Sequence, residues 1–354
     1  MKVTNIDGMG SYGVYIDGVD FAHLTDEQWR EIGHIHMKSL VTIIRDCNLS
    51  CENQLGWIKK FGEPRHGLYY RLMKKYGITS LGLLVRVGLS ANSQMDAEDK
   101  SVIRECIQYQ QSTSEGAGIA RVSGSKDAKG RSIGLFNDGE LLWHSNEAAT
   151  LTFTPGVALL GAKCMVGSST GFLQTADYYA SVSESFRSEL DEMVVTHRYT
   201  EGKINPVLDD NLGRSNMCPV DDTEIPMVIR SPGGIKGLHY PLNTIYGIRG
   251  MSKAESDSLF AEINKHLYVD HYIYDHWYKN DKDLLLFDNS ITLHRRLGNV
   301  PGRLAYRIQH DYSELQDDFW QPYFQKEFAD TYKETITDFV ETLGLHSFKL
   351  PQVS

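Results

Sequence analysis

Long apolar runs are missing from this sequence. No window reaches the roughly 18 consecutive apolar residues that a membrane-spanning helix needs, and the Gly- and Asp-rich N-terminus lacks the apolar stretch of a secretory signal peptide. We therefore expect a cytoplasmic protein without a membrane partner. Hydrophobic residues make up 41% and charged residues 23% of the 354 residues, which indicates an ordinary folded chain rather than a disordered or fibrous one.

Basic residues are also fewer than acidic ones. The chain has 36 Lys and Arg residues against 46 Asp and Glu residues, so its net charge is −10. Because affinity for nucleic acids comes mostly from neutralised phosphates, we expect neither DNA nor RNA as a partner. A small-molecule substrate is the partner that we expect, and the sequence leaves a homo-oligomer open.

A disulfide framework is absent as well. The five cysteines are odd in number and scattered, and only Cys47 and Cys51 lie close together. This spacing indicates reduced thiols. A structural zinc site at Cys47 and Cys51 lacks a second pair of ligands, so we do not expect one.

Short strands dominate what is present. Apolar and β-branched runs predict strands at 12–21, 40–45, 157–165, 170–174, 227–230, 244–248, 284–287 and 304–309. No repeat or linker divides the chain, so we expect a single domain over residues 1–354. Many short strands without regular βαβ alternation predict a mainly β fold, a sandwich or barrel core with flanking helices.

Helices are expected at four places. Thr25 with Gln28 and Ser252 with Glu255 have the spacing of capping boxes, and Ser50 can cap a further helix. The fourth helix is predicted by apolar residues at spacings of three and four, namely Tyr179, Val182, Phe186, Leu190 and Met193.

The stretch from about 66 to 135 is harder to assign. It contains polar and Gly/Ser-rich segments, including one around 112–125. Long segments of this kind inside a compact domain are usually lids or binding loops. We therefore predict an insertion with a mobile loop that covers the site as a lid.

The segment Trp143-His144-Ser145-Asn146-Glu147 combines several side chains that can bind a metal ion. In an extended strand, residues two apart point the same way, so His144 and Asn146 are expected on one face and Glu147 on the other. With 13 histidines in the chain, such a tripeptide alone is weak evidence.

A second imidazole and two cations follow the apolar strand predicted at 284–287: His294, then Arg303 and Arg307. A non-haem Fe(II) site needs two imidazoles and a third group in a facial array, with positions left open for a chelating cosubstrate and O₂. An arginine beyond the second histidine can bind the distal carboxylate of that cosubstrate through two charge-assisted hydrogen bonds.

With these residues in this order, the sequence resembles the taurine dioxygenase family of Fe(II)- and 2-oxoglutarate-dependent oxygenases. The resemblance covers most of the chain, and its most specific piece is the FDNSITLH segment at 287–294. The other similar segments are GVYIDGVD (13–20), LTDEQ (24–28), 41–46, FGE (61–63), WHSN (143–146), TPG (154–156), GSST (167–170) and GMSKAES (250–256).

This resemblance implies a double-stranded β-helix, a cupin-like jelly roll with added helices, and it implies Fe(II), 2-oxoglutarate and O₂ as cofactor and cosubstrates. By the same resemblance, His144 and His294 would be iron ligands. Arg303 would pair with the C5 carboxylate of 2-oxoglutarate, and Thr170 would hydrogen-bond the cosubstrate.

Substrate contacts are also implied. Arg307 matches a position that in some members meets an anionic substrate group, and its alternative is an ordinary surface arginine. The interval between His294 and Arg303 is shorter than is usual in the family, so Arg303 and Arg307 can exchange roles. His239 and Tyr240 are further expected contacts of a small polar substrate that is anionic or amino-acid-like.

Asn146 stands where the family carries a carboxylate, and this difference leaves several hypotheses open. Asn146 binds iron through its carbonyl oxygen or leaves the place to water. Alternatively, a bulge turns Glu147 inward and restores a carboxylate ligand. In a third hypothesis the vacancy accepts a halide, as in related halogenases, where a small residue replaces the carboxylate. A non-catalytic relative that only binds a ligand is the fourth.

The function that we expect is hydroxylation of a substrate C–H bond, with release of succinate and CO₂. A halogenase on the same scaffold is the alternative enzyme. In either case the protein contributes facial ligands, an arginine clamp and a cover that excludes water, while the metal and cosubstrate carry the oxidative chemistry.

Overall fold

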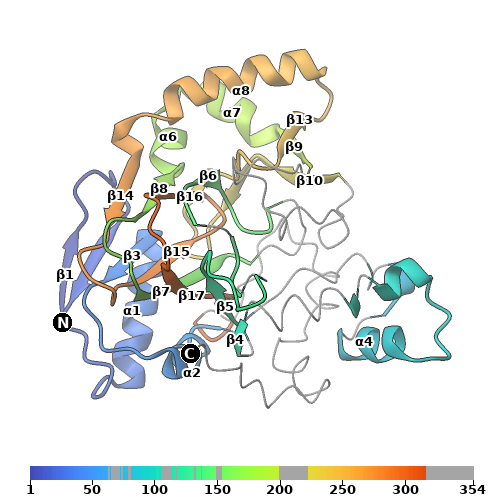
Figure 1. Ribbon diagram of the computed structural model, residues 1–354. Helices are drawn as coiled ribbons and strands as arrows, with labels where there is room; N and C mark the ends of the chain where they lie inside the picture. Colours follow the sequence, from blue (N-terminus) through green and yellow to red (C-terminus); the bar gives the residue numbers. More distant parts are fainter. Residues whose placement is uncertain are drawn as a thin grey trace.

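Two facing β-sheets with helices on their outer sides make up the core of the computed structural model (Figure 1). The structure describes residues 1–62, 64, 72, 75–78, 81–101, 103–104, 114–116, 118–130, 133–136, 138–148, 154–198 and 222–315. This mainly β architecture is a double-stranded β-helix, which confirms the fold expected from the resemblance.

The larger sheet has eight strands. Their order across the sheet is β1 (Lys2–Asn5), β2 (Val14–Asp17), β3 (Val41–Ile44), β15 (Leu284–Asp288), β7 (Gly156–Lys163), β17 (Leu304–His310), β5 (Ile119–Val122) and β4 (Ser114–Gly116). Neighbours pair antiparallel except β2 and β3, which are parallel.

The smaller sheet has four strands and supplies much of the candidate site. Their order is β14 (Ile273–Trp277), β8 (Ser169–Gln174), β16 (Thr292–Leu297) and β6 (Leu141–His144). Short strands beside it form two further ribbons: β10 (Thr223–Pro226), β9 (Val194–His197) and β13 (Ile245–Ile248), and β11 (Val228–Arg230) with β12 (Lys236–Leu238).

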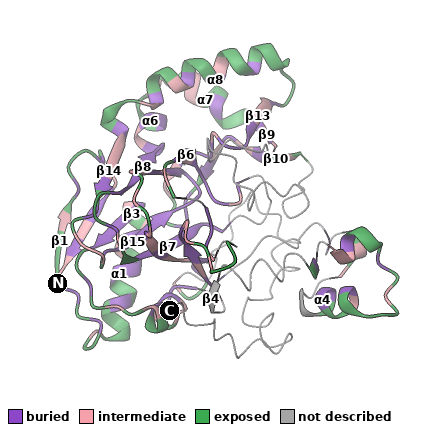
Figure 2. Ribbon diagram, in the orientation of Figure 1, coloured by how far each residue is buried: buried purple, intermediate pink, exposed green. Residues whose placement is uncertain are grey.

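Strand periodicity explains how β15 joins two cores. Successive side chains of a strand point to opposite faces, and all five residues of β15 are buried. Leu284 and Leu286 pack in one cluster with Trp29 of helix α1 (Asp26–Ser39). Leu285 and Phe287 pack in the cluster between the two sheets. The continuous apolar run in the sequence therefore reflects a strand that is covered on both faces, as the purple strands of Figure 2 show.

Capping boxes begin two of the helices, as predicted. At α1, the backbone N–H of Gln28 donates to the Thr25 hydroxyl at 3.2 Å, and the Thr25 N–H donates to the Gln28 side chain at 3.0 Å. The same reciprocal pair joins Ser252 and Glu255 at the start of α8 (Lys253–Leu267). The Ser50 hydroxyl caps α2 (Cys51–Ile58). These caps satisfy N–H groups that a helix start leaves without partners.

The helix predicted around 179–193 is two helices, α6 (Ala176–Ser181) and α7 (Glu184–Glu192). Val182 between them is extended, with φ −73° and ψ 158°. The Ser183 hydroxyl accepts the Phe186 N–H at 3.3 Å and so begins a new helix. The prediction of one helix is wrong, because the apolar spacing continues across the break and periodicity cannot reveal it.

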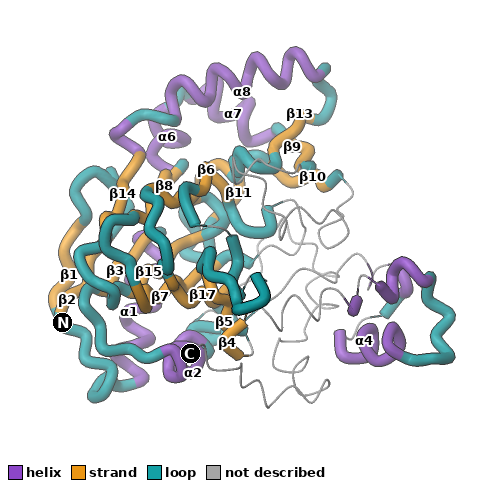
Figure 3. The backbone as a smooth tube through the Cα atoms, in the orientation of Figure 1, coloured by secondary structure: helices purple, strands orange, loops and turns teal. Residues whose placement is uncertain are grey.

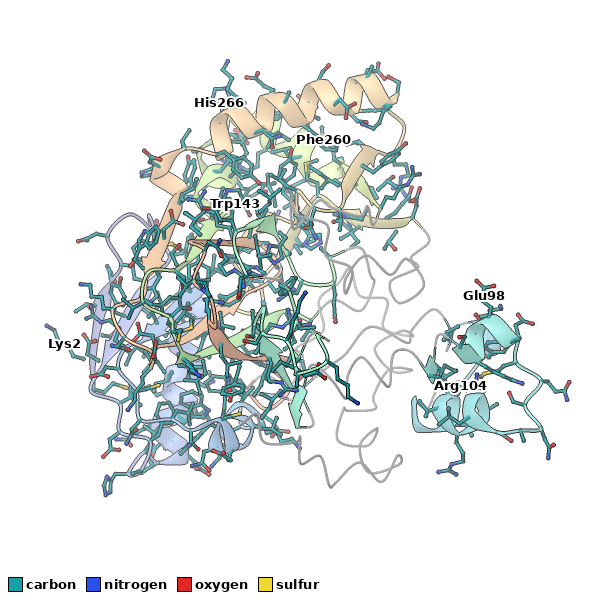
Figure 4. All side chains as sticks on the ribbon, viewed as in Figure 1. Lys2, Glu98, Arg104, Trp143, Phe260 and His266 are labelled. Carbon is teal, nitrogen blue, oxygen red and sulfur yellow. The ribbon has the colours of Figure 1, made fainter. Side chains whose placement is uncertain are left out.

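The helices lie outside the sheets, as Figure 3 shows with helices in purple and strands in orange. In Figure 4, Phe260 lies on the inner side of α8 and His266 projects outward, in agreement with their burial. None of the helices in the described part of the chain is long and apolar enough to cross a membrane.

Part of the predicted insertion belongs to the main sheet. Residues 119–122 form β5, which pairs with β17, and both Ile119 and Val122 are buried. This differs from the loop expected there, since the apolar side chains within the Gly/Ser-rich segment are enough to hold a strand. Helix α4 (Leu81–Leu89) lies to the side of the two sheets, together with the labelled Glu98 and Arg104 (Figures 1 and 4). Residues 65–71, 73–74, 79–80, 102 and 105–113 lie outside the described residues, and the role of this stretch as a lid stays a prediction.

Candidate active site

Two buried histidines lie side by side on neighbouring strands of the smaller sheet. His144 ends β6 and pairs in register with His294 of β16. Their ring centroids are 4.1 Å apart, with 49° between the ring planes. Neither imidazole is more than 9% exposed. The strand register thus brings together two residues that are 150 positions apart in the chain.

Burial keeps both imidazoles neutral near pH 7. Burial, together with the positive charges of Arg307 and Arg296, lowers the pKa of His144 to about 4. The pKa of His294 lies well below its usual value, because of burial and the neighbouring His144 and Arg307. His144 Nδ1 donates to the Leu142 carbonyl at 2.6 Å, which leaves Nε2 with the lone pair. Neutral imidazole with a free lone pair is the form that binds metal ions.

The histidines line a cavity whose charged residues are all arginines. Strands β8, β16, β17 and β6 supply much of its wall. The lining residues are Val122, Phe136, Leu141, His144, Asn146, Leu159, Thr170, Phe287, His294, Arg295, Arg296, Arg303 and Arg307. Among these described residues there is no carboxylate, so the cavity is suited to anionic ligands.

Asn146 reaches the same cavity, but from a turn rather than a strand. Strand β6 ends at His144, and residues 146–148 form a turn in which Glu147 has a φ of 56°. Arg307 Nη1 donates to Asn146 Oδ1 at 3.2 Å. A guanidinium can only donate, so the carbonyl side of the Asn146 amide faces Arg307. Asn146 Nδ2 is buried without a hydrogen-bond partner within the described residues.

Glu147 lies apart from Asn146, outside the cavity lining, as the sequence predicts, but for a different reason than strand alternation. Asn146 lines the cavity beside His144, and Glu147 is not among the lining residues. Strand alternation would give this arrangement too, yet the segment has left the strand by then. The left-handed backbone of Glu147 shows that turn geometry, not alternation, separates the two side chains.

At another part of the cavity wall, Arg303 is buried and only partly paired. It is 3% exposed, and its Nε donates to the Ser168 hydroxyl at 3.0 Å. Its guanidinium carbon lies 5.7 Å from the ring centroid of Tyr278, whose hydroxyl is 2.8 Å from that of Thr170. Burial lowers the pKa of Arg303. Arg303 Nη1 is buried and has no hydrogen-bond partner in the described part of the chain.

His239 and Tyr240 do not line this cavity. His239 is fully buried, and its Nδ1 donates to the Ser290 carbonyl at 2.7 Å. The Tyr240 hydroxyl donates to the Phe260 carbonyl at 3.3 Å inside the cluster beneath α8. Both side chains are occupied by packing, which offers a structural reason for their presence in the sequence.

Several residues around the site were not predicted. Ser168 and Tyr278 hold Arg303 and Thr170, and Asn243 and Asn289 hold the backbone beside His144. Only Ser168 and Asn289 lie within segments that the sequence singled out. Arg295 pairs with Asp275 at 2.5 Å and stacks over the ring of Trp143, which Figure 4 shows in the middle of the molecule. No local pattern in the sequence marks Tyr278 or Asn243.

Metal-binding clusters of other kinds were not found in the described residues, where no three His, Cys, Asp or Glu side chains gather. Cys47, Cys51 and Cys164 are not in disulfide bonds. The cavity that His144 and His294 line also contains the neutral carboxamide of Asn146, and no carboxylate is among its described lining residues.

Comparisons with known proteins agree with this site. Residues 5–309 match the profile of the family described as taurine catabolism dioxygenase TauD, TfdA family. The chain belongs to this family. It is an Fe(II)- and 2-oxoglutarate-dependent dioxygenase, an oxidoreductase that uses O₂ and acts on small molecules. No curated protein matches the sequence.

Solved structures share the fold at low sequence identity. A putative α-ketoglutarate-dependent taurine dioxygenase from Burkholderia xenovorans is 19% identical, with a TM-score of 0.57 over 88% of this chain and 90% of that one. A taurine dioxygenase from the same organism is 18% identical, with a TM-score of 0.56 over 90% and 94%. AAD-2, in complex with Mn(II) and N-oxalylglycine, is 15% identical, with a TM-score of 0.57 over 88% and 97%.

Proposed function

We propose that this dioxygenase hydroxylates a C–H bond of a small anionic or amino-acid-like substrate, with 2-oxoglutarate converted to succinate and CO₂. The proposal rests on one observation. A pair of neutral imidazoles and a buried, incompletely paired arginine line a single cavity without any carboxylate in its described wall. A metal ion and a dicarboxylate together match that set of groups.

His144 and His294 are the proposed iron ligands. Imidazole nitrogen suits Fe(II), and the rings are close enough for one ion to contact both. The neutral state of both rings means that no proton has to be displaced from either before the metal binds. AAD-2, which shares the fold, binds Mn(II) and N-oxalylglycine, and these are chemical analogues of Fe(II) and 2-oxoglutarate.

Arg303 is the proposed partner of the cosubstrate's C5 carboxylate. Its Nη1 is the only N–H of this side chain that is both buried and without a partner in the described residues. A buried guanidinium nitrogen without a hydrogen-bond partner is costly, and a bound carboxylate relieves that cost. Thr170 and Tyr278 lie beside it and are placed to hydrogen-bond the same ligand.

Bound Fe(II) and 2-oxoglutarate supply the O₂ activation and the oxidative decarboxylation. The chain holds the ligands in place and limits the access of water, since both histidines and Arg303 are nearly fully buried. Arg307 supports an anionic substrate, because it lines the cavity and stays charged at any physiological pH.

Asn146 is the residue that sets this site apart. Its carbonyl oxygen already accepts a hydrogen bond from Arg307. We propose that the third protein-side position of the metal is filled by that oxygen's second lone pair or by water, and not by Glu147, which lies outside the cavity lining. A neutral group leaves the site one charge unit more positive than a carboxylate would.

Halogenation is the second candidate, favoured by one specific observation. The cavity has four arginines in its wall and the buried side-chain Nδ2 of Asn146, a donor without a partner among described residues. These groups would stabilise a halide beside the metal. Hydroxylation remains the first proposal, since the carboxamide fills space that a halide needs.

The test uses purified protein with Fe(II), 2-oxoglutarate and O₂, and a panel of small carboxylates and amino acids. We expect succinate formation that rises with one or more panel compounds and a product that gains the mass of one oxygen atom. The same reactions with chloride or bromide would give a halogenated product if the second candidate is correct. Failure to form succinate, with both ligands bound, would indicate a non-catalytic relative.

A further inference from the structure

Two asparagine side chains make the backbone hydrogen bonds beside His144 that a neighbouring strand would otherwise make. After β6 ends, the backbone of Ser145 and Asn146 is buried but continues in no strand. The Asn289 side chain accepts the Asn146 N–H at 2.9 Å and donates to the Asn146 carbonyl at 2.9 Å. Asn243 does the same for Ser145, at 3.3 Å and 3.4 Å.

This pattern fixes the backbone of Asn146. Buried backbone N–H and C=O groups need hydrogen-bond partners, and a carboxamide carries a donor and an acceptor side by side. Because one amide binds both the N–H and the C=O of Asn146, it holds the two peptide planes that flank its Cα. The positions of these planes determine the direction of the Cα–Cβ bond, and so where the Asn146 side chain begins.

Asn289 is itself held firmly. It is fully buried, its backbone N–H donates to the Pro155 carbonyl at 2.7 Å, and its side chain also donates to Thr154 at 2.9 Å. The Asp288 carboxylate accepts the N–H groups of residues 290 and 291, which shapes the turn between β15 and β16. His294 follows on β16. One turn therefore supports both the second histidine and the segment that carries the first.

We propose that Asn289 is a positioning residue that directs the Asn146 side chain into the cavity, with Asn243 supporting the preceding residue. The consequence for the metal site rests on the function proposed above. Without the Asn289 amide, Asn146 loses both backbone partners, and its side chain no longer has one fixed direction beside His144 and His294.

The first test needs no metal. Hydrogen exchange of the backbone amide of Asn146, measured by NMR in full-length Asn289→Ala, should be about tenfold faster or more than in the wild type. Ser256→Ala is the control, because it removes a buried side-chain hydrogen bond, to the Ile248 N–H at 3.0 Å, in which none of Asn146, Asn243 and Asn289 takes part. If Asn289→Ala does not accelerate exchange at Asn146 more than the control does, the proposal is wrong.

The second test asks whether Asn289 acts through Asn146. Co(II) bound in place of Fe(II) reports on its coordination through visible absorption. We expect Asn289→Ala and Asn146→Ala to alter this spectrum alike, and the double variant to match Asn146→Ala alone. Additive changes, or a wild-type spectrum in Asn289→Ala, would overturn the positioning role. Failure of the wild type to bind Co(II), with the exchange result intact, would instead refute the proposed metal site.

Discussion

The two sides of the cavity hold their polar groups in different ways. Around Arg303, the hydroxyls of Ser168, Thr170 and Tyr278 come from strands or residues adjacent to them. Around Asn146, a turn is held by side-chain amides from distant segments. The Arg303 side contains the residues that the family resemblance assigns to the cosubstrate, whereas the Asn146 side carries the substitution. The substituted side chain thus lies in the part of the wall that the strands do not build.

This contrast suggests how the substitution is tolerated. Strand alternation fixes the inward direction of Thr170, His294 and Arg307, whatever residue stands at position 146. Replacing a carboxylate by an amide of similar shape alters charge without altering this frame. The Asn146 amide then pairs with Arg307 through its oxygen.

Loss of a histidine should give the largest effect. His294→Ala removes half of the proposed metal-binding pair, so we expect Mn(II) binding under anaerobic conditions to disappear from calorimetric titrations. His239→Asn is the matched control, because His239 is buried outside the cavity, and its variant should retain wild-type affinity. Metal binding that survives in His294→Ala would place the ion elsewhere.

Arg303→Ala should have the next largest effect. An unpaired buried carboxylate costs about 2–5 kcal/mol, so the KM for 2-oxoglutarate should rise at least about 30-fold. Arg307→Ala should raise it much less and should instead weaken the binding of an anionic substrate. The reverse order in steady-state kinetics would mean that the two arginines exchange roles.

A smaller effect is expected on the other side of the cavity. Asn146→Asp supplies a charged ligand and should strengthen Mn(II) binding about tenfold, an estimate based on one added charge-assisted contact. Glu147→Gln should leave the affinity unchanged. If Glu147→Gln abolishes metal binding while Asn146→Ala does not, Glu147 is the ligand and our placement of the turn is wrong.

The smallest expected effect is the loss of stability at low pH that two buried histidines in or beside the larger sheet should cause. Burial lowers the pKa of His36 to about 3 and that of His310 to about 4. Both bind a proton more readily when unfolded, with a pKa near 6.5. The metal-free protein should therefore lose stability as pH falls from about 6.5 to 4. His36→Gln should flatten the dependence of Tm on pH. An unchanged slope would show that His36 is not a source of the loss of stability.

Part of the structure could be predicted from the sequence because its signals are local. The capping boxes at Thr25 and Ser252 and the apolar run at β15 each depend on neighbouring residues. The break at Ser183 could not be predicted, since the apolar spacing runs through it. Strand β16 was missed because its inward residues are polar site residues such as His294 and Arg296.

The candidate site divides in the same way. His144, His294, Arg303 and Thr170 were identified through family resemblance, and the structure brings them to one cavity. Tyr278 and Asn243 reach their positions only through pairing between distant segments, which no sequence spacing encodes. His239 and Tyr240 had been assigned from family habits, and the cavity lining does not include them.

The most direct test of the central claim measures succinate formed by wild-type protein, Asn146→Ala and Glu147→Gln with Fe(II), 2-oxoglutarate and O₂. The claim is that His144 and His294, both neutral, hold a working iron site without a carboxylate ligand from the protein. We predict that the wild type and Glu147→Gln form succinate at equal rates and that Asn146→Ala retains part of that rate. Succinate formation by the wild type that Glu147→Gln abolishes would contradict the claim.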